Sequence, residues 1–124
     1  MISNCEVTLA QPADAIAIAE LSRDAIEQGL GWSWTPRRVL RSVRDASTNV
    51  AVARRDGALL GFAIMQYGDE DAHLLLLAVR AAQRRQGVGK ALLAWLETTA
   101  RVAGIALIRL ETRASNMGGR SFYS

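Results

Sequence analysis

The segment that decides the fold reads RRQGVGKALL, residues 84–93, and it joins an apolar run to a strongly helical segment. Gly87 and Gly89 allow another molecule to approach the main chain closely. The helix that follows directs its free N–H groups at whatever lies in front of it, and such groups favour an anion. Two arginines and a lysine add positive charge, so the segment is typical of a phosphate-binding loop between a strand and a helix.

Two common phosphate-binding motifs do not fit this loop. A P-loop needs a glycine five positions before Gly89 and a hydroxyl residue after its lysine, but the chain has Arg84 and Ala91 there. A dinucleotide-binding fingerprint needs a third glycine three places after Gly89, where Leu92 stands. The sequence therefore excludes both motifs.

Hydrophobic periodicity and turn residues predict strands alternating with helices around the loop. Strands are expected at 6–9, 49–53, 58–67, 73–79 and 105–110, and helices from Pro12 to Gly29, from Pro36 to about Arg44, from about Val88 to Gly104 and from near Asn116. Asp56 and Gly57 favour a hairpin turn. The continuous apolar run 73–79 suits a central strand that is covered on both faces.

The helix after the glycine loop carries apolar side chains at spacings of three and four. The stripe expected to face the core is Val88, Leu92, Trp95, Thr99 and Val102. Gly104 is a natural stop for this helix. The apolar run that follows, 105–110, indicates a second buried strand, which ends at Glu111.

Length and composition favour one packed domain, residues 1–124, because half of the residues are hydrophobic and 22% are charged. The longest apolar run, 74–79, is too short to span a bilayer, so no membrane partner is expected. The N-terminus lacks the pattern of a signal peptide, and the single cysteine, Cys5, cannot form an intrachain disulfide. These features predict a cytoplasmic protein. The net charge of +3 favours anionic partners only mildly.

The loop resembles the signature of the GNAT superfamily of acyl-CoA-dependent N-acetyltransferases. That signature is Gln or Arg, two residues, Gly, one residue, then Gly or Ala, and Arg84, Gly87 and Gly89 occupy its fixed positions. The resemblance implies an α/β domain with a mixed, mainly antiparallel sheet flanked by helices on both sides. It also implies acetyl-CoA as the acyl donor.

Two segments would contact this donor. In such a fold the pantetheine arm pairs with the main chain of the strand before the loop, where a backbone N–H near Ala78 or Val79 would stabilise the oxyanion. Backbone N–H groups and basic side chains, Arg80 among them, would hold the pyrophosphate. The expected cofactor-binding residues are Leu77, Ala78, Val79, Arg84, Arg85, Gln86, Gly87, Val88, Gly89, Lys90 and Asn116.

A second block, LETRASN at 110–116 followed by Phe122 and Tyr123, is similar to the ribosomal-protein alanine N-acetyltransferase group of that superfamily. In that group a glutamate acts as general base and a tyrosine twelve positions later as general acid. Glu111 and Tyr123 have this spacing, and the asparagine of the block contacts the cofactor. The resemblance implies acetyl transfer to a primary amine, either a protein N-terminal amine or a small molecule.

Plainer interpretations stand beside these roles. Glu111 would also suit an ion pair with Arg109 or Arg113, and Tyr123 would suit a packing position. The alternative is therefore a non-catalytic acyl-CoA-binding or interaction module. The family continues past the tyrosine with two further strands, so the chain looks C-terminally truncated relative to it. A longer chain, or a second copy in a homodimer, would supply those strands.

The remaining polar and aromatic residues favour structural roles. His73 is the sole histidine and lies in an apolar run, so we expect a structural residue and no metal site. The arginines of the second helix are expected to form a solvated face, and no nucleic-acid partner is expected. Trp32 and Trp34 either line the amine pocket or cap the core.

Overall fold

The computed structural model of the chain describes residues 5–83 and 87–114. The strands are β1 (Glu6–Leu9), β2 (Thr48–Arg55), β3 (Ala58–Tyr67), β4 (Asp71–Val79) and β5 (Leu107–Ala114). The helices are α1 (Ala15–Ala25), α2 (Pro36–Arg44) and α3 (Val88–Val102), with short 3-10 turns η1 (Pro12–Asp14) and η2 (Ala81–Gln83). The helix expected near Asn116 lies outside the described residues.

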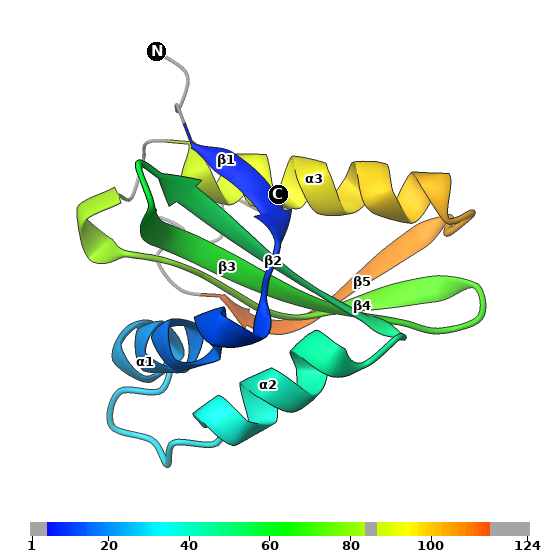
Figure 1. Cartoon of the computed structure of the whole chain (residues 1–124). Helices are drawn as coiled ribbons and strands as arrows, with labels where there is room; N and C mark the ends of the chain where they lie inside the picture. The colour runs from blue at the N-terminus through cyan, green and yellow to red at the C-terminus, as the bar shows by residue number, and fades with distance from the viewer. Residues whose placement is uncertain (1–4, 84–86, 115–124) are drawn as a thin grey trace.

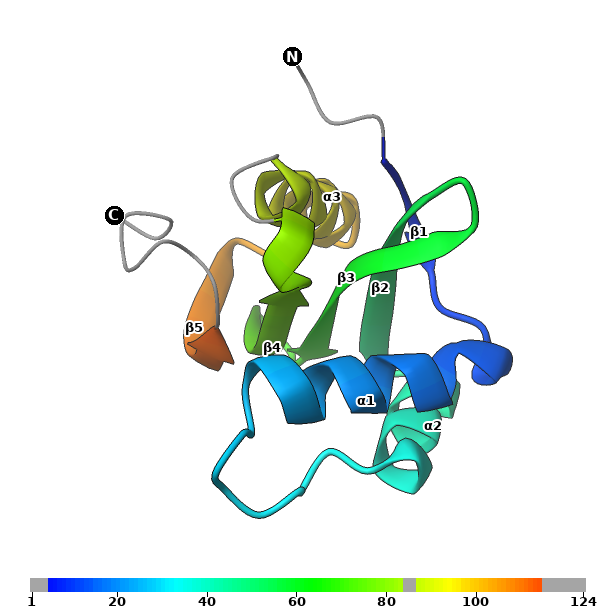
Figure 2. The same cartoon turned by 90° about the vertical axis from the view of Figure 1, so that its left-hand side faces the viewer.

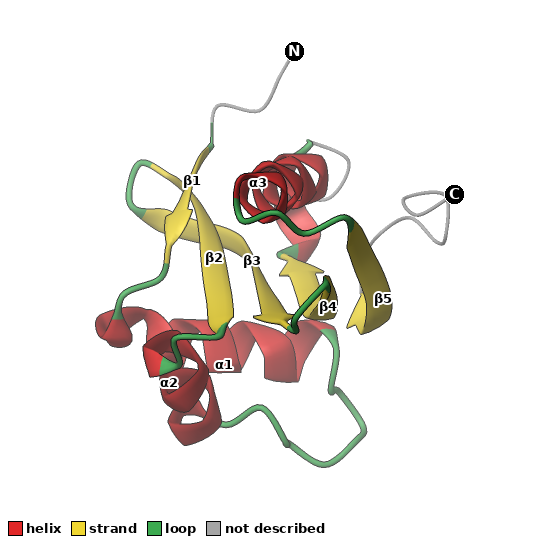
Figure 3. Cartoon of the chain, turned by 90° about the vertical axis from the view of Figure 1, so that its right-hand side faces the viewer, coloured by secondary structure: helices red, strands yellow, loops and turns green. Residues whose placement is uncertain are grey.

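The strands form one sheet in the order β1-β2-β3-β4-β5 (Figure 1). Each strand pairs antiparallel with the next except β4 and β5, which run parallel. Helices α1 and α2 cover one face of the sheet and α3 covers the other (Figure 3). This architecture confirms the predicted mixed, mainly antiparallel sheet with helices on both sides. No helix within the described ranges is both long and apolar enough to cross a membrane.

Local sequence explains where two of the elements begin and end. Thr35 caps α2, because its Oγ1 accepts a hydrogen bond from the Arg38 N–H at 3.3 Å, and Pro36 occupies the first turn. Asp56 and Gly57 have φ angles of 53° and 84°, as the predicted hairpin turn requires. The predicted start of α2 at Pro36 and the predicted turn at Asp56 and Gly57 are both confirmed.

The sheet separates two hydrophobic cores because successive side chains of a strand point to opposite faces. The core under α1 and α2 includes Ile18, Val39, Val52, Phe62 and Leu76. The core under α3 includes Ala63, Leu74, Leu77, Leu92 and Leu96. The central strand β4 contributes to both cores, as its continuous apolar sequence predicted.

The predicted core stripe of α3 was partly wrong. Its buried residues are Val88, Leu92, Leu96 and Ala100, whereas Val102 is 84% exposed and Trp95 and Thr99 are only partly buried. The observed residues form one row at a spacing of four. A twisted sheet turns away beneath a straight helix, so the contact follows such a row rather than a line parallel to the helix axis.

Several element boundaries also differ from the prediction: β2 is longer at both ends, β4 begins earlier, at Asp71, and β5 and α1 differ as follows. Strand β5 begins two residues later than expected and continues through Glu111, and it is not buried, since Leu107 and Leu110 are about half exposed, at 50% and 46%. It pairs with β4 alone among the described strands, which makes it an edge. Helix α1 ends at Ala25, and Gly29, with a φ of 81°, lies in the loop beyond it rather than at its cap.

Replacing Gly61 should destabilise the domain, because β3 and β4 approach closely there. A Cβ at this position would lie 2.7 Å from the Ala78 carbonyl oxygen, which is main chain and cannot rotate away. We expect Gly61→Ala to lower the free energy of unfolding by about 1–3 kcal/mol, measured by urea denaturation.

Gly31→Ala is the matched control. A Cβ at Gly31 would meet nothing within 4 Å, and the residue does not have a positive φ. Equal stability of the two variants would contradict the close approach of β3 and β4.

Candidate functional site

The end of β4 is held in the sheet by its neighbours. On one side β4 pairs with β3 as far as Val79, which lies opposite Gly61. On the other side its register with β5 shifts between Leu74 and Leu76, and the last pair within the described residues is Leu77 and Ala114. Ala78 and Val79 follow that pair at the end of β4.

Helix α3 is the next α-helix along the chain after β4. Gly87 is its N-cap and has a left-handed backbone, with φ 84° and ψ 5°, which residues with a Cβ rarely adopt. The first hydrogen bond of the helix runs from Ala91 N to Gly87 O, at 2.9 Å. The N–H groups of Val88, Gly89 and Lys90 precede that bond and have no acceptor within the helix. This end of α3 can bind an anion through its main chain.

The structure brings together only part of the predicted site. Leu77, Ala78, Val79, Gly87, Val88, Gly89 and Lys90 lie around the junction between β4 and α3 (Figure 2). Arg84, Arg85, Gln86, Asn116 and Tyr123 lie outside the described residues. The main chain of Glu111 lies in β5, one residue beyond Leu110, which is opposite Leu74 of β4.

Arg109, one of the two partners considered for Glu111, pairs with Asp71. Its Nε lies 2.6 Å from Asp71 Oδ2, and this hydrogen bond, opposed by partial burial, holds the pKa of Asp71 below its usual value. His73 Nε2 lies 3.5 Å from Asp71 Oδ1. The Arg109–Asp71 pair joins β5 to β4 near the start of both strands, and His73, also on β4, lies beside it.

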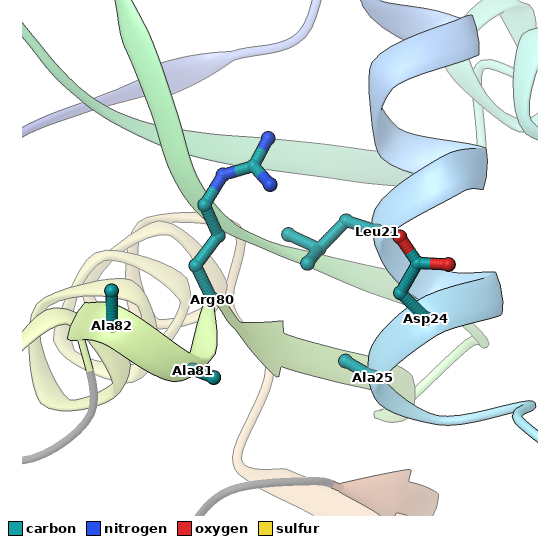
Figure 4. Close-up of a pocket in the computed structure, with 6 residues that line it drawn as sticks. All are labelled: Leu21, Asp24, Ala25, Arg80, Ala81 and Ala82. Atoms are coloured by element: carbon teal, nitrogen blue, oxygen red, sulfur yellow. The ribbon is translucent and has the colours of Figure 1, made fainter.

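A pocket of about 310 Å³ lies on the α1 face of the sheet, beside the end of β4 (Figure 4). Leu21, Asp24 and Ala25 of α1 form one wall, and Arg80, Ala81 and Ala82 form the other. Its volume is near the lower end of the range for small-molecule sites, roughly 300–1,000 Å³. Sequence reasoning missed the wall on α1, because nothing in the sequence shows that the end of α1 lies against the segment after β4.

A buried carboxylate holds the loop between α1 and α2. Glu27 is 1% exposed, and its Oε1 accepts hydrogen bonds from the N–H and hydroxyl of Ser33, at 2.7 and 2.8 Å. Its Oε2 accepts one from the Ser22 hydroxyl at 2.8 Å, and the Trp34 N–H lies 3.2 Å away. Burial by itself raises the pKa of Glu27, but these hydrogen bonds together lower it below the usual value.

Sequence reasoning missed Glu27, because a glutamate just beyond a helix usually faces solvent. The nearby serines, Ser22 and Ser33, were the sequence feature that could have indicated a hydrogen-bonded carboxylate at Glu27.

The tryptophans of the loop differ in role: Trp34 is buried in the core, whereas Trp32 is 37% exposed and donates from Nε1 to the Ala19 carbonyl at 3.2 Å. Trp34 therefore caps the core.

No cluster of three or more His, Cys, Asp or Glu side chains that would suit a metal ion occurs in the described part of the chain.

A left-handed glycine opens α3, which follows β4 along the chain, and the loop sequence predicted such a connection between a strand and a helix. Residues 16–124 match the family described as the acetyltransferase (GNAT) family. The chain belongs to this GNAT family.

Individual relatives agree with the assignment of this GNAT domain. The ribosomal protein bS18-alanine N-acetyltransferase of Escherichia coli is 38% identical over 69 residues, which are 56% of this chain and 47% of the relative. The chain spans about half the length of the curated relatives that it matches.

Solved structures agree with the fold. The PaiA N-acetyltransferase of Thermoplasma acidophilum, solved in complex with coenzyme A, is 22% identical, with a TM-score of 0.85 over 97% of this chain and 86% of that one. The ribosomal-protein-alanine N-acetyltransferase of Brucella melitensis is 23% identical, with a TM-score of 0.73 over 87% and 79%.

Removing the charge of Glu27 should loosen the loop of this GNAT domain. We expect Glu27→Gln to lower the free energy of unfolding by about 1–3 kcal/mol at pH 7, because charge-assisted hydrogen bonds to the serines and to Trp34 are lost. Because the pKa of Glu27 is lower in the folded state than its value of 4.5 in the unfolded chain, the ionised carboxylate stabilises the wild type fully above about pH 4.5. This stabilisation is lost as the pH falls through the folded-state pKa.

Thermal midpoints measured from pH 7 down to pH 3 would test both effects. The gap between wild type and Glu27→Gln should narrow below about pH 4.5. Glu20→Gln, an exposed position on the same helix, is the control and should leave the midpoint unchanged. A gap that stays constant with pH would contradict the ionised state of Glu27.

Proposed function

We propose that this GNAT domain transfers an acetyl group from acetyl-CoA to a primary amine. The observation that carries the proposal is the left-handed Gly87, which opens α3, the α-helix that follows β4 along the chain. The family membership supports the same activity. The start of α3 offers main-chain donors for phosphates, and β4 would offer main-chain groups for an extended chain.

The donor would bind along this region in two parts. The N–H groups of Val88, Gly89 and Lys90 would hold the pyrophosphate, with help from the positive end of the α3 dipole. The amides of the pantetheine arm would pair with the main chain of β4 at Ala78 and Val79. This binding would bring the thioester to the gap between β4 and β5.

The reaction would then proceed by direct attack. The neutral amine nitrogen attacks the thioester carbonyl carbon, and a backbone N–H of β4 stabilises the oxyanion. Glu111 takes the proton that the amine loses, directly or through water. The carbon–sulfur bond breaks, and Tyr123 gives its proton to the departing thiolate. The products are the acetamide and free coenzyme A.

The acceptor in this proposal is a protein N-terminal amine. The name of the Escherichia coli relative supports that choice, and the LETRASN block lies in the part of the chain that resembles the same group. A small-molecule amine is the competing acceptor. Assays with an N-terminal peptide and with a small amine, each with acetyl-CoA, would separate the two.

Acetyl-CoA should stabilise the domain against heat. At about a hundred times its dissociation constant a ligand adds roughly 2.7 kcal/mol, which raises the midpoint of a domain of this size by on the order of 10 °C. Gly87→Asp should abolish this rise, because it strains the left-handed N-cap and places a negative charge where the phosphates bind.

Gly57→Asp is the matched control for that variant. Gly57 has the same φ of 84° but lies in the hairpin turn between β2 and β3. Its variant should keep the full rise with acetyl-CoA. No rise in a cooperatively folded wild type would contradict donor binding, and binding without turnover of any amine would favour the non-catalytic module.

Glu111→Gln and Tyr123→Phe should each lower kcat by about 10²-fold or more, because each removes one proton transfer. The thermal shift with acetyl-CoA should stay nearly intact in both variants. Glu97→Gln, an exposed position on α3, is the control and should keep wild-type kcat. Unchanged turnover in both catalytic variants would contradict the roles assigned to Glu111 and Tyr123.

A further inference from the structure

The pocket between α1 and η2 carries a fixed positive group. Arg80 Nε donates to the Leu59 carbonyl at 2.6 Å, and its main-chain N–H donates to the Leu60 carbonyl at 2.8 Å. These two bonds anchor the residue to β3. Neither terminal nitrogen of the guanidinium has a partner among the described residues. An anchored guanidinium with two free nitrogens is suited to bind a carboxylate in a bidentate manner.

The opposite wall carries a negative group. Asp24 lies on α1, where its Oδ1 accepts from Arg23 Nε at 3.1 Å, and its side chain is 65% exposed. Between the two charges the lining is apolar and consists of Leu21, Ala25, Ala81 and Ala82. Figure 4 shows the charged side chains coming from the two different walls. Such a pocket favours a ligand that carries a positive and a negative group over one that carries only negative charge.

The position of the pocket separates it from the phosphate end of the donor. The pocket lies on the α1 face of the sheet, whereas α3 and its N-terminal N–H groups cover the other face (Figure 2). Arg80 directly follows Val79, the last residue of β4 and one of the two residues proposed to pair with the pantetheine arm. A ligand in the pocket would therefore lie next to the thioester, on the side from which an amine could approach.

We propose that this pocket is an acceptor subsite that recognises a carboxylate of the amine substrate through Arg80. The inference rests on the proposed acetyl transfer and deepens it by naming the acceptor class: a primary amine with a carboxylate a few bonds away. Asp24 attracts the amine end of the same molecule as it enters. The carboxylate belongs either to a free amino acid or to an acidic side chain that follows a peptide N-terminus.

Two pairs of acceptors test the subsite and distinguish these sources. The first pair is alanine and alaninamide, and the second is the amidated peptides Ala-Glu-Ala-Ala and Ala-Gln-Ala-Ala. Within each pair only the carboxylate differs. With the wild type we expect kcat/KM to favour the acid of at least one pair by about tenfold, the effect of one charge-assisted hydrogen bond.

Arg80→Gln should bring that ratio close to one. The ratio compares two substrates of a single variant, so a loss of stability from the missing bond to Leu59 would not change it. Arg101→Gln, at an exposed position on α3, is the control and should keep the wild-type ratio. A wild-type ratio near one in both pairs, or a ratio that Arg80→Gln leaves unchanged, would overturn the proposal.

A binding measurement keeps the subsite testable even if no amine is acetylated. In a titration with alanine or with the glutamate peptide, the amide resonances of Ala81 and Ala82 should shift in wild type but not in Arg80→Gln. Such shifts without turnover would support the subsite while contradicting the proposed reaction. Absence of shifts with both acids would overturn the subsite.

If Arg80→Gln loses the thermal shift with acetyl-CoA but keeps the wild-type ratio of kcat/KM between acid and amide acceptors, Arg80 binds acetyl-CoA rather than the acceptor. That outcome would also overturn the proposal.

Discussion

The pairing of β4 is the constraint on which the rest of the structure depends. This strand pairs with β3 as far as Val79, and within the described residues its parallel pairing with β5 reaches Leu77 and Ala114. A strand held in this way presents its main-chain groups in a fixed position in a rigid sheet. Arg80, which lines the pocket on the α1 face, directly follows β4, and α3 is the next α-helix along the chain.

The rigidity of β4 comes from packing on both of its faces. Leu76 and Ala78 lie in the core under α1 and α2, and Leu77 and Val79 lie in the core under α3. Gly61 allows β3 to approach so closely that a single methyl group would collide with the Ala78 carbonyl. The two cores and this close approach together fix the main chain of β4, which is what a site built from backbone groups requires.

The loop between α1 and α2 is organised by a different interaction. Glu27 substitutes for regular secondary structure there, because its carboxylate satisfies N–H groups that no helix or strand would otherwise pair. The same carboxylate bonds Ser22 of α1, so the loop is tied to the helix that forms one wall of the pocket. The hydrogen bonds of Glu27 therefore connect the loop to the helix that lines the pocket.

The sequence by itself determined the elements and the glycine loop, because these depend on local chemistry. Thr35 and Pro36 begin a helix, Asp56 and Gly57 form a turn, and the apolar run of β4 needs cover on both faces, wherever the chain goes next. The spacing of Arg84, Gly87 and Gly89 likewise needed no tertiary information to indicate the family, since a phosphate-binding loop is defined by neighbours along the chain.

Only the tertiary structure decided which residues face one another across the fold. The buried row of α3 follows the twist of the sheet, Leu107 and Leu110 of β5 are about half exposed, and Glu27 is buried among hydrogen-bond donors rather than solvated. The pocket joins Asp24 to Arg80, which are 56 positions apart in the chain. Such contacts depend on how helices cross the sheet, and that geometry is set by long-range packing that no local pattern records.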